Sequence, residues 1–255
     1  MLRSRITPCL LVHNKGLVKT VKFKGPKYVG DPINAVKIFN EKEVDELIVL
    51  DIDASANNQD PDFRMIEKLA MECRMPLCYG GGVKTVEQAI RIINLGVEKV
   101  ALSSAIIDNP SLVQDISKAV GRQSVVAVFD VKKTLLGGYN VYIHNGIKKI
   151  KTDLVHILKE IDELGVGEIV INSIDNDGVM NGYDHKLIAL VRDVVNVPIT
   201  ALGGAGHLDH IKSLISQFKV IGASAGSLFV FKGVYKAVLI NYPNLQDKEK
   251  LLPEI

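Results

Sequence analysis

The sequence contains no tryptophan, only three cysteines and no hydrophobic run of membrane-spanning length. Cys9, Cys73 and Cys78 have neither the even number nor the spacing of a disulfide framework, and no Cys-x-x-Cys pair indicates zinc. The basic N-terminus leads into an apolar run, residues 6–12, that is far too short for a signal peptide or for a membrane helix of about 20 residues. We therefore expect a soluble, cytoplasmic protein with reduced thiols, no membrane contact, and neither metal nor cofactor.

An excess of charge of one sign is also lacking, because 31 basic residues face 29 acidic ones, a formal net charge of +2. This balance argues against a nucleic-acid-binding surface, so any phosphate must be bound by a local group of residues. The 255 residues can build one sizeable core. This length suits a single α/β barrel as well as two small domains.

What the sequence does contain is a regular alternation of short apolar runs with amphipathic stretches of helical length. Strands are predicted at residues 6–12, 46–53, 76–81, 99–104, 124–130, 168–175, 198–204 and 219–226, and the last predicted helix covers 228–242. Nearly all-apolar strands joined by helices are typical of a parallel sheet that is buried on both faces. We predict a single (βα)8 TIM barrel domain over residues 1–255. The tail of this domain, from residue 243, is expected to be only partly ordered. The alternative, a doubly wound open sheet, lacks a G-x-G-x-x-G after the first strand.

The chain also repeats itself at half its length. The run ELIVLDID from Glu46 matches EIVINSID from Glu168, and residues 81–82 match residues 203–204, in both cases 122 positions apart. A repeat of this kind is the pattern of two fused half-barrels. The halves would cover about residues 1–120 and 121–245.

Two glycine-rich segments, YGGGV at 79–83 and LGGAG at 202–206, follow matching strands of the two halves. Glycine lets backbone N–H groups approach an anion closely, and the loops after barrel strands form the catalytic face. Two such loops favour a substrate with a phosphate at each end. Tight turns without a ligand are the alternative.

Carboxylates follow several strands: Asp51, Asp53, Asp130, Asp175 and Asp177. An aspartate at a strand end can serve general acid–base catalysis or can cap the following loop. Asp130 is the strongest catalytic candidate, because it ends an otherwise apolar strand. The half-repeat pairs this residue with Leu11, so the matching acid of the first strand is missing.

Residues 13–30 form a long basic segment after the first strand, with lysines at 15, 19, 22, 24 and 27. A glycine-containing loop over a barrel mouth can act as a lid whose lysines reach a phosphate. A solvated charged loop is the alternative.

From Arg3 to about Tyr242 the chain resembles the cyclase subunit of imidazole glycerol phosphate synthase, through the motifs DPINAVKIF, DELIVLDIDAS, YGGGV, NPSLV, SIDNDGVMNGYD and GGAG. The resemblance implies a class I glutaminase on the N-terminal face of the barrel and ammonia that passes through the barrel. In that family the ammonia reacts with a bisphosphorylated ribulosyl-aminoimidazole carboxamide nucleotide, which agrees with two phosphate sites.

Site residues carried over by this resemblance fall into three groups. A charged gate at the bottom of the barrel would comprise Arg5, Glu46, Lys99 and Glu168, although charges at strand starts can also form a purely structural layer of ion pairs. The catalytic acid matches Asp130, the lid lysine matches Lys19, and the acid after the sixth strand matches Asp177. Phosphate-binding positions match Gly82, Ser104, Gly178, Gly204 and Ser227.

Departures from the family pattern gather at the active face. The strand-one catalytic aspartate is Leu11, the glycine after the lid lysine is Thr20, and a small polar residue is Leu202. Loss of a general acid–base typically removes about 10²–10⁴-fold in rate.

Three functions remain open. The first is an amidotransferase barrel subunit with a changed acceptor, similar to paralogues that work with their own glutaminase, and with a separate sugar-amidating enzyme, in acetamidino synthesis on nucleotide sugars. The second is an authentic histidine-pathway cyclase in which Asp51 or Asp177 replaces the missing acid. The third is a non-catalytic conduit that activates a glutaminase and delivers ammonia to another protein.

Overall fold

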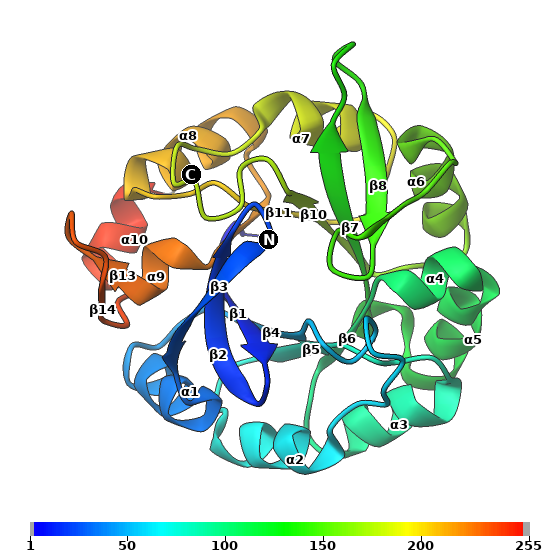
Figure 1. Ribbon diagram of the computed structural model, residues 1–255, viewed down its shortest axis with the longest axis horizontal. Coiled ribbons are helices and arrows are strands. Elements are labelled where there is room, and N and C mark those ends of the chain that lie inside the picture. The colour runs from blue at the N-terminus through cyan, green and yellow to red at the C-terminus, as the bar shows by residue number, and fades with distance from the viewer. Residues whose placement is uncertain (1–2, 252–255) are drawn as a thin grey trace.

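The computed structural model describes residues 3–251, and within them eight parallel strands close into a barrel surrounded by helices (Figure 1). The barrel strands are β1 (Arg5–His13), β4 (Leu47–Asp51), β5 (Leu77–Gly80), β6 (Lys99–Leu102), β7 (Val125–Lys133), β10 (Glu168–Ser173), β11 (Ile199–Leu202) and β12 (Gly222–Ala225). Strand β12 pairs with β1, and β10 pairs with both β7 and β11, which closes the sheet. The predicted (βα)8 barrel is confirmed.

Helices cover the outside of the barrel, and their N-termini follow from the sequence. They are α1 (Pro32–Glu41), α2 (Phe63–Glu72), α3 (Val86–Asn94), α5 (Ser111–Val120), α6 (Leu154–Glu163), α7 (His185–Arg192) and α8 (Leu208–Phe218), with a short α4 (Ser104–Asp108) and the 3₁₀ turn η1 (Arg122–Ser124). Asp31, Asp62 and Asp184 each accept a hydrogen bond from a backbone N–H of the first helical turn, and Thr85 forms a capping box with Gln88. No helix within residues 3–251 is long and apolar enough to cross a membrane.

Side-chain alternation along the strands divides the apolar residues into two groups. One group faces the helices and forms the main core. The other fills the barrel interior and comprises Cys9, Ile48, Cys78, Ala101, Val126, Val128, Val170 and Leu202, with Leu11 and Leu50 at its upper edge. Strands buried on both faces explain why the sequence pattern shows continuous apolar runs.

The expectation of a loop over residues 13–30 is wrong, because this segment continues β1 into an antiparallel hairpin. Its strands are β2 (Gly16–Val21) and β3 (Lys24–Gly30). Asn14 and Lys15 form the first turn with positive φ of 48° and 63°, the left-handed geometry of a two-residue hairpin turn. A second hairpin continues β7 into β8 (Tyr139–Ile143) and the two-residue β9 (Lys148–Lys149).

The last predicted helix, 228–242, is also wrong. A helix is present only as α9 (Ser227–Val230), after which β13 (Phe231–Lys232) and β14 (Ala237–Val238) form a hairpin. Phe231 is already extended, with a φ of −111° and a ψ of 145°, which ends the helix, and Gly233 at a φ of +73° lies in the hairpin turn.

Part of the tail, which was predicted to be only partly ordered, is helical. Residues 245–251 form α10 (Leu245–Leu251), and Lys248 holds it to the barrel through Asp45 at 2.8 Å. Residues 252–255, the end of the predicted tail, lie outside the described residues.

Candidate active site and charge ring

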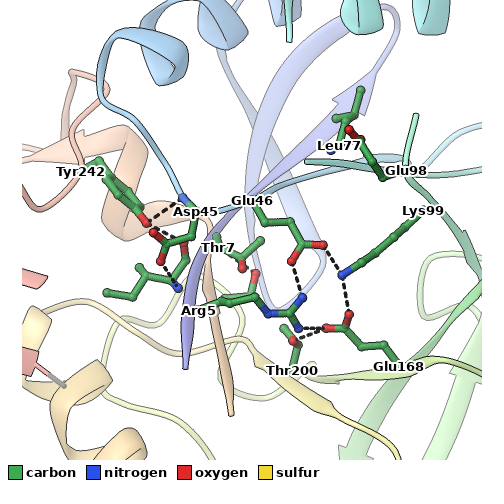
Figure 2. A network of polar contacts seen from close by, with 12 residues as sticks. Arg5, Thr7, Asp45, Glu46, Leu77, Glu98, Lys99, Glu168, Thr200 and Tyr242 are labelled. Carbon is green, nitrogen blue, oxygen red and sulfur yellow. Dashed lines mark hydrogen bonds and ion pairs between the residues drawn. The ribbon is translucent and has the colours of Figure 1, made fainter. Parts of the chain in front are cut away.

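Four charged side chains close the N-terminal end of the barrel in a ring, and we call Arg5, Glu46, Lys99 and Glu168 the charge ring (Figure 2). The Arg5 guanidinium lies 2.7 Å from each glutamate, and the Lys99 Nζ lies 2.6 Å from Glu46 and 2.8 Å from Glu168. Each residue stands at or next to the first residue of its strand, where its side chain points inward. Positive and negative charges therefore alternate around the opening.

Neighbouring charges favour the charged form of three ring members, whereas burial and the charge of Glu168 raise the pKa of Glu46. Burial opposes the charges of Arg5 and Lys99, but the two glutamates outweigh it and raise the pKa of both cations. Burial also opposes ionisation of Glu168, yet the two cations and the Thr200 hydroxyl, which donates at 2.6 Å, hold the pKa of Glu168 below its usual range. Removing one member would leave each of its two partners buried with only one of its two opposite charges, which is costly for buried ions.

At the opposite, C-terminal end of the strands a cavity of about 120 Å³ opens, which we call the strand-end cavity. The apolar barrel interior lies between this cavity and the charge ring. All five predicted phosphate-binding residues line the cavity: Gly82, Ser104, Gly178, Gly204 and Ser227. The backbone φ values of Gly82, Gly178 and Gly204 are +75°, +66° and +115°, which favours glycine at these turns.

Asp130 lines this cavity and hydrogen-bonds a side chain of the neighbouring strand. The Asn172 Nδ2 group donates to the Asp130 carboxylate at 2.9 Å. Burial raises the pKa of Asp130 to about 7, and the hydrogen bond from Asn172 only partly opposes this shift. A carboxyl that titrates near neutral pH can both accept and donate a proton, as acid–base catalysis needs.

The other two carboxylates of the cavity lining hold loops. Asp51 accepts hydrogen bonds from the backbone N–H groups of Asp53 and Ala54 at 3.0 and 3.1 Å. Asp177 accepts from the Thr20 hydroxyl at 2.7 Å and from the Phe23 N–H at 3.3 Å, and so ties the β2–β3 hairpin to the barrel. Their contacts are those of caps, the alternative that the sequence left open.

Lys19 lies inside the protein rather than on an exposed lid. Its ammonium donates to the Cys9 carbonyl at 2.5 Å, and burial lowers its pKa. A Cβ added to Gly226 would lie 2.5 Å from the Lys19 Nζ, so the ammonium reaches the loop that carries Ser227.

The departures Leu11 and Leu202 both line the strand-end cavity. Leu11 is on β1 and Asp130 is on β7, four strands away around an eight-stranded barrel and hence on the opposite wall. The β1 side chain opposite Asp130 is therefore apolar, although the Lys19 ammonium also reaches this strand, at the Cys9 carbonyl. Thr20 has a structural role, because its hydroxyl anchors Asp177.

The cavity lining includes residues that were not predicted from the sequence, and two of them have buried atoms without a partner among the described residues. Asn172 and His144 both line the cavity, and each has one buried side-chain atom, Oδ1 and Nδ1 respectively, without a hydrogen-bond partner among the described residues. Asn172 immediately precedes the motif SID at residues 173–175, and strand parity points it inward. No local motif marks His144, whose place depends on the β8 hairpin. Across residues 3–251, no group of three or more His, Cys, Asp or Glu side chains is arranged to hold a metal ion.

A barrel whose polar cavity lies at the carboxyl ends of its strands places the molecule among the (βα)8 proteins with a ligand site on that face. Comparison with known proteins narrows this class. The family model described as histidine biosynthesis protein matches residues 5–236. The chain belongs to this family, and within it to the HisF-type subunits of imidazole glycerol phosphate synthase.

Three relatives illustrate the similarity. The chain is 59% identical over 253 residues to the Vibrio vulnificus protein named "Putative imidazole glycerol phosphate synthase subunit hisF3", covering 99% of this chain and 97% of the relative. It is 51% identical over 245 residues to the Pseudomonas aeruginosa protein named in the same way as subunit hisF2, covering 96% and 98%. The imidazole glycerol phosphate synthase subunit HisF of Exiguobacterium sibiricum is 42% identical over 211 residues, covering 83% of this chain and 84% of the relative.

Proposed function

We propose that this chain is the barrel subunit of a glutamine amidotransferase complex that aminates a phosphorylated acceptor other than the histidine-pathway intermediate. The observation that carries the proposal is Leu11, which faces the cavity from the wall opposite Asp130. Closure of an imidazole ring needs proton transfers at several atoms, and a leucine can make none of them. Amination of a simpler acceptor can proceed with one carboxyl.

The charge ring and the apolar interior support a path for ammonia. A class I glutaminase would dock on the N-terminal face and release ammonia at the ring, and uncharged ammonia would cross the interior to Asp130. The Lys99 side chain is only 16% exposed and helps to close the ring. A rotation of this side chain alone would open the ring without unfolding a strand. A purely structural ion-pair layer makes the opposite prediction, namely that the ring never opens.

Two glycine loops support a phosphorylated acceptor. The loops at 79–83 and 202–206 lie on the same cavity, and Ser104 and Ser227 stand at the helix starts beside them. Backbone N–H groups and hydroxyls at such positions are suited to phosphate.

The similarity of the relatives supports a paralogue of the histidine-pathway subunit, and we propose acetamidino-sugar synthesis as its role. Identity is 59%, 56% and 51% to three proteins whose names carry the word putative, those of Vibrio vulnificus, Leptospira borgpetersenii and Pseudomonas aeruginosa, but 42% to the HisF subunit of Exiguobacterium sibiricum, whose name does not. In this role the chain would supply ammonia that replaces the oxygen of an acetamido group on a nucleotide sugar, and that oxygen would leave as phosphate after activation by a nucleoside triphosphate. Because the sequence lacks a nucleotide-cofactor fingerprint, activation of that oxygen would fall to a separate sugar-amidating enzyme.

Two alternatives have their own supporting observations. An authentic cyclase is favoured by the retained Asp130 and by the family itself, but it needs Asp51 or Asp177 to act as the second acid although both bind loop backbone. A non-catalytic conduit is favoured by the intact charge ring together with the altered active face.

The test is a transfer assay with this chain, a class I glutaminase that binds it, amide-¹⁵N glutamine and a nucleotide-linked acetamido sugar, run with and without the sugar-amidating enzyme. Mass spectrometry of the sugar reports transfer, and glutamate formation reports hydrolysis. We expect Asp130→Asn to abolish transfer while glutamine is still hydrolysed. Retained transfer in Asp130→Asn would support the conduit instead.

Lys99→Ala tests the path itself. We expect this variant to keep glutaminase stimulation and lose transfer, whereas unchanged transfer would favour the structural layer. Lys37→Ala is the matched control, because Lys37 forms an exposed pair with Glu72 at 3.4 Å on the outer helices.

A further inference from the structure

One layer of inward-facing side chains forms the floor of the strand-end cavity, and the proposed function assigns a role only to its carboxyl group. In the register of the strands, Asp130 on β7 pairs with Asn172 on β10, and Asn172 pairs with Leu202 on β11. Farther round the barrel, Leu11 on β1 pairs with Leu50 on β4. All five residues line the cavity. The floor therefore has a polar sector on β7 and β10 and an apolar sector on β11, β1 and β4.

The apolar sector, which consists of Leu11, Leu50 and Leu202, is packed from below. Leu11 and Leu50 lie against the residues that fill the barrel interior, and Leu202 is itself one of those residues. Leu50 has Gly80 as its register partner on β5. A Cβ on Gly80 would lie 2.9 Å from a methyl group of Leu50, so this leucine leans over the space that a side chain there would take. The sector thus presents aliphatic surface to a ligand.

Polar side chains beside the apolar sector are engaged elsewhere. The Lys19 ammonium, from the hairpin that continues β1, donates to the Cys9 carbonyl, and an ammonium accepts no hydrogen bond. Asp51, next to Leu50 on β4, accepts from two backbone N–H groups of the following loop. A ligand group that donates hydrogen bonds would therefore find no side-chain acceptor in the apolar sector itself.

This division of the floor suits a ligand group with two unlike edges. Its polar edge can exchange hydrogen bonds with Asp130 and Asn172, whereas the other edge must be apolar, because a buried polar group without a partner is costly. A secondary amide with a short alkyl group has this form, since its carbonyl oxygen and its alkyl group diverge from one carbon. A primary carboxamide fits less well, because it would turn an amino group toward the leucines.

We propose that the apolar sector determines acceptor specificity by binding the short alkyl end of an N-acyl group whose carbonyl oxygen faces Asp130. This inference rests on the proposed function and deepens it, because it names the methyl group of the N-acetyl substituent as the part of the acceptor that the three leucines recognise. In this orientation the acyl carbon lies above the apolar interior, through which ammonia would arrive.

The test is isothermal titration of the full chain with a nucleotide-linked N-acetyl sugar and with its N-carbamoyl analogue, in which an amino group replaces the methyl group. The two ligands have the same size and planar shape, so only the polarity of the group at the leucines differs. We expect the wild type to bind the N-acetyl sugar roughly 10-fold more tightly or better. Leu11→Asn and Leu202→Asn place an amide of similar branched shape in the sector, and each should reduce this preference to about 3-fold or less.

Leu136→Asn is the matched control and should keep the wild-type preference, because Leu136 is fully exposed in the turn between β7 and β8. Thermal unfolding checks the fold of each variant, and the wild-type comparison needs no variant. Equal affinity of the wild type for both ligands would overturn this inference and leave the proposed function intact. An undiminished preference in folded Leu11→Asn and Leu202→Asn variants would do the same. Binding of neither ligand by the wild type would overturn the proposed acceptor and this inference together.

Discussion

Replacing Asp130 by asparagine should stabilise the protein at alkaline pH, in the same variant that loses transfer. The folded protein raises the pKa of Asp130 to about 7 through burial, whereas an unfolded aspartate titrates near 3.9. Between these values the folded state binds the proton that the unfolded state releases, so the free energy of unfolding falls as pH rises. Below about pH 4 both states are protonated and the penalty is absent.

The magnitude follows from the size of the shift. Roughly three pKa units at 1.36 kcal/mol each give an upper bound of about 4 kcal/mol above pH 7. Because part of the side chain faces the cavity, we expect about 2 kcal/mol. Asparagine removes the titration and preserves the shape, and its Nδ2 can donate to the Asn172 Oδ1 atom that has no partner.

The assay is urea unfolding of wild type and Asp130→Asn at pH 4.5 and pH 8. We expect the variant to be more stable at pH 8 and nearly equal at pH 4.5. Asp115→Asn, on an exposed position of α5, should show no such pH dependence. A variant without added stability at pH 8, or with the same gain at both pH values, would refute a buried Asp130 with a raised pKa.

Three further substitutions test the charge ring, the close contact between Gly178 and the β2–β3 hairpin, and the hydrogen bond between Asn172 and Asp130. Lys99→Met should lower the free energy of unfolding by about 3 kcal/mol, measured in urea, because two buried glutamates lose one of their two cations. Gly178→Ala should cost about 2 kcal/mol or more and shift the thermal midpoint downward, because its Cβ would lie 2.0 Å from the Thr20 carbonyl at a φ of +66°. Asn172→Ala should raise the pKa of Asp130 further, as read by carbon NMR of the carboxyl, because the Asn172 hydrogen bond lowers that pKa.

Each of these has a control within the chain. Lys37→Met breaks an exposed pair and should cost less than about 1 kcal/mol; an equal loss in both lysine variants would contradict a buried ring. Gly137→Ala places a side chain at a φ of +85° in open space. If this variant lost as much stability as Gly178→Ala, the clash with Thr20 would not be the cause of the Gly178→Ala loss. An unchanged or lowered Asp130 pKa in Asn172→Ala would show that the hydrogen bond does not act on the carboxyl.

The barrel could be predicted because it depends on periodic features of the chain, whereas the charge ring was implied by the resemblance to the cyclase family and agreed with the position of its charges at strand starts. Alternation of apolar runs with amphipathic stretches predicts strand–helix units, and strand parity turns a charge at a strand start, such as Glu46 or Glu168, toward the axis. The hairpin over residues 13–30 was missed because its lysines suggested a solvated loop, although Asn14 and Lys15 are a suitable hairpin turn.

The site could be predicted only in part, because its remaining members come together through tertiary structure. Asp130 ends an apolar strand, and the half-repeat identifies Leu11 as its counterpart. His144 has no such signal, since it lies in an ordinary turn sequence and reaches Ser104 only because the hairpin folds back over the barrel. The two fused half-barrels themselves stay a prediction from the sequence repeat.

The most direct measurement is turnover of the bisphosphorylated histidine-pathway intermediate by this chain at high ammonium concentration, beside the variant Leu11→Asp. With ammonium supplied, neither the glutaminase nor the charge ring limits the reaction, so the assay reports the strand-end cavity alone. We expect no cyclisation by the wild type and a gain of activity in Leu11→Asp, which restores an acid opposite Asp130. Turnover by the wild type at a rate typical of a cyclase would contradict a changed acceptor and return the chain to histidine synthesis.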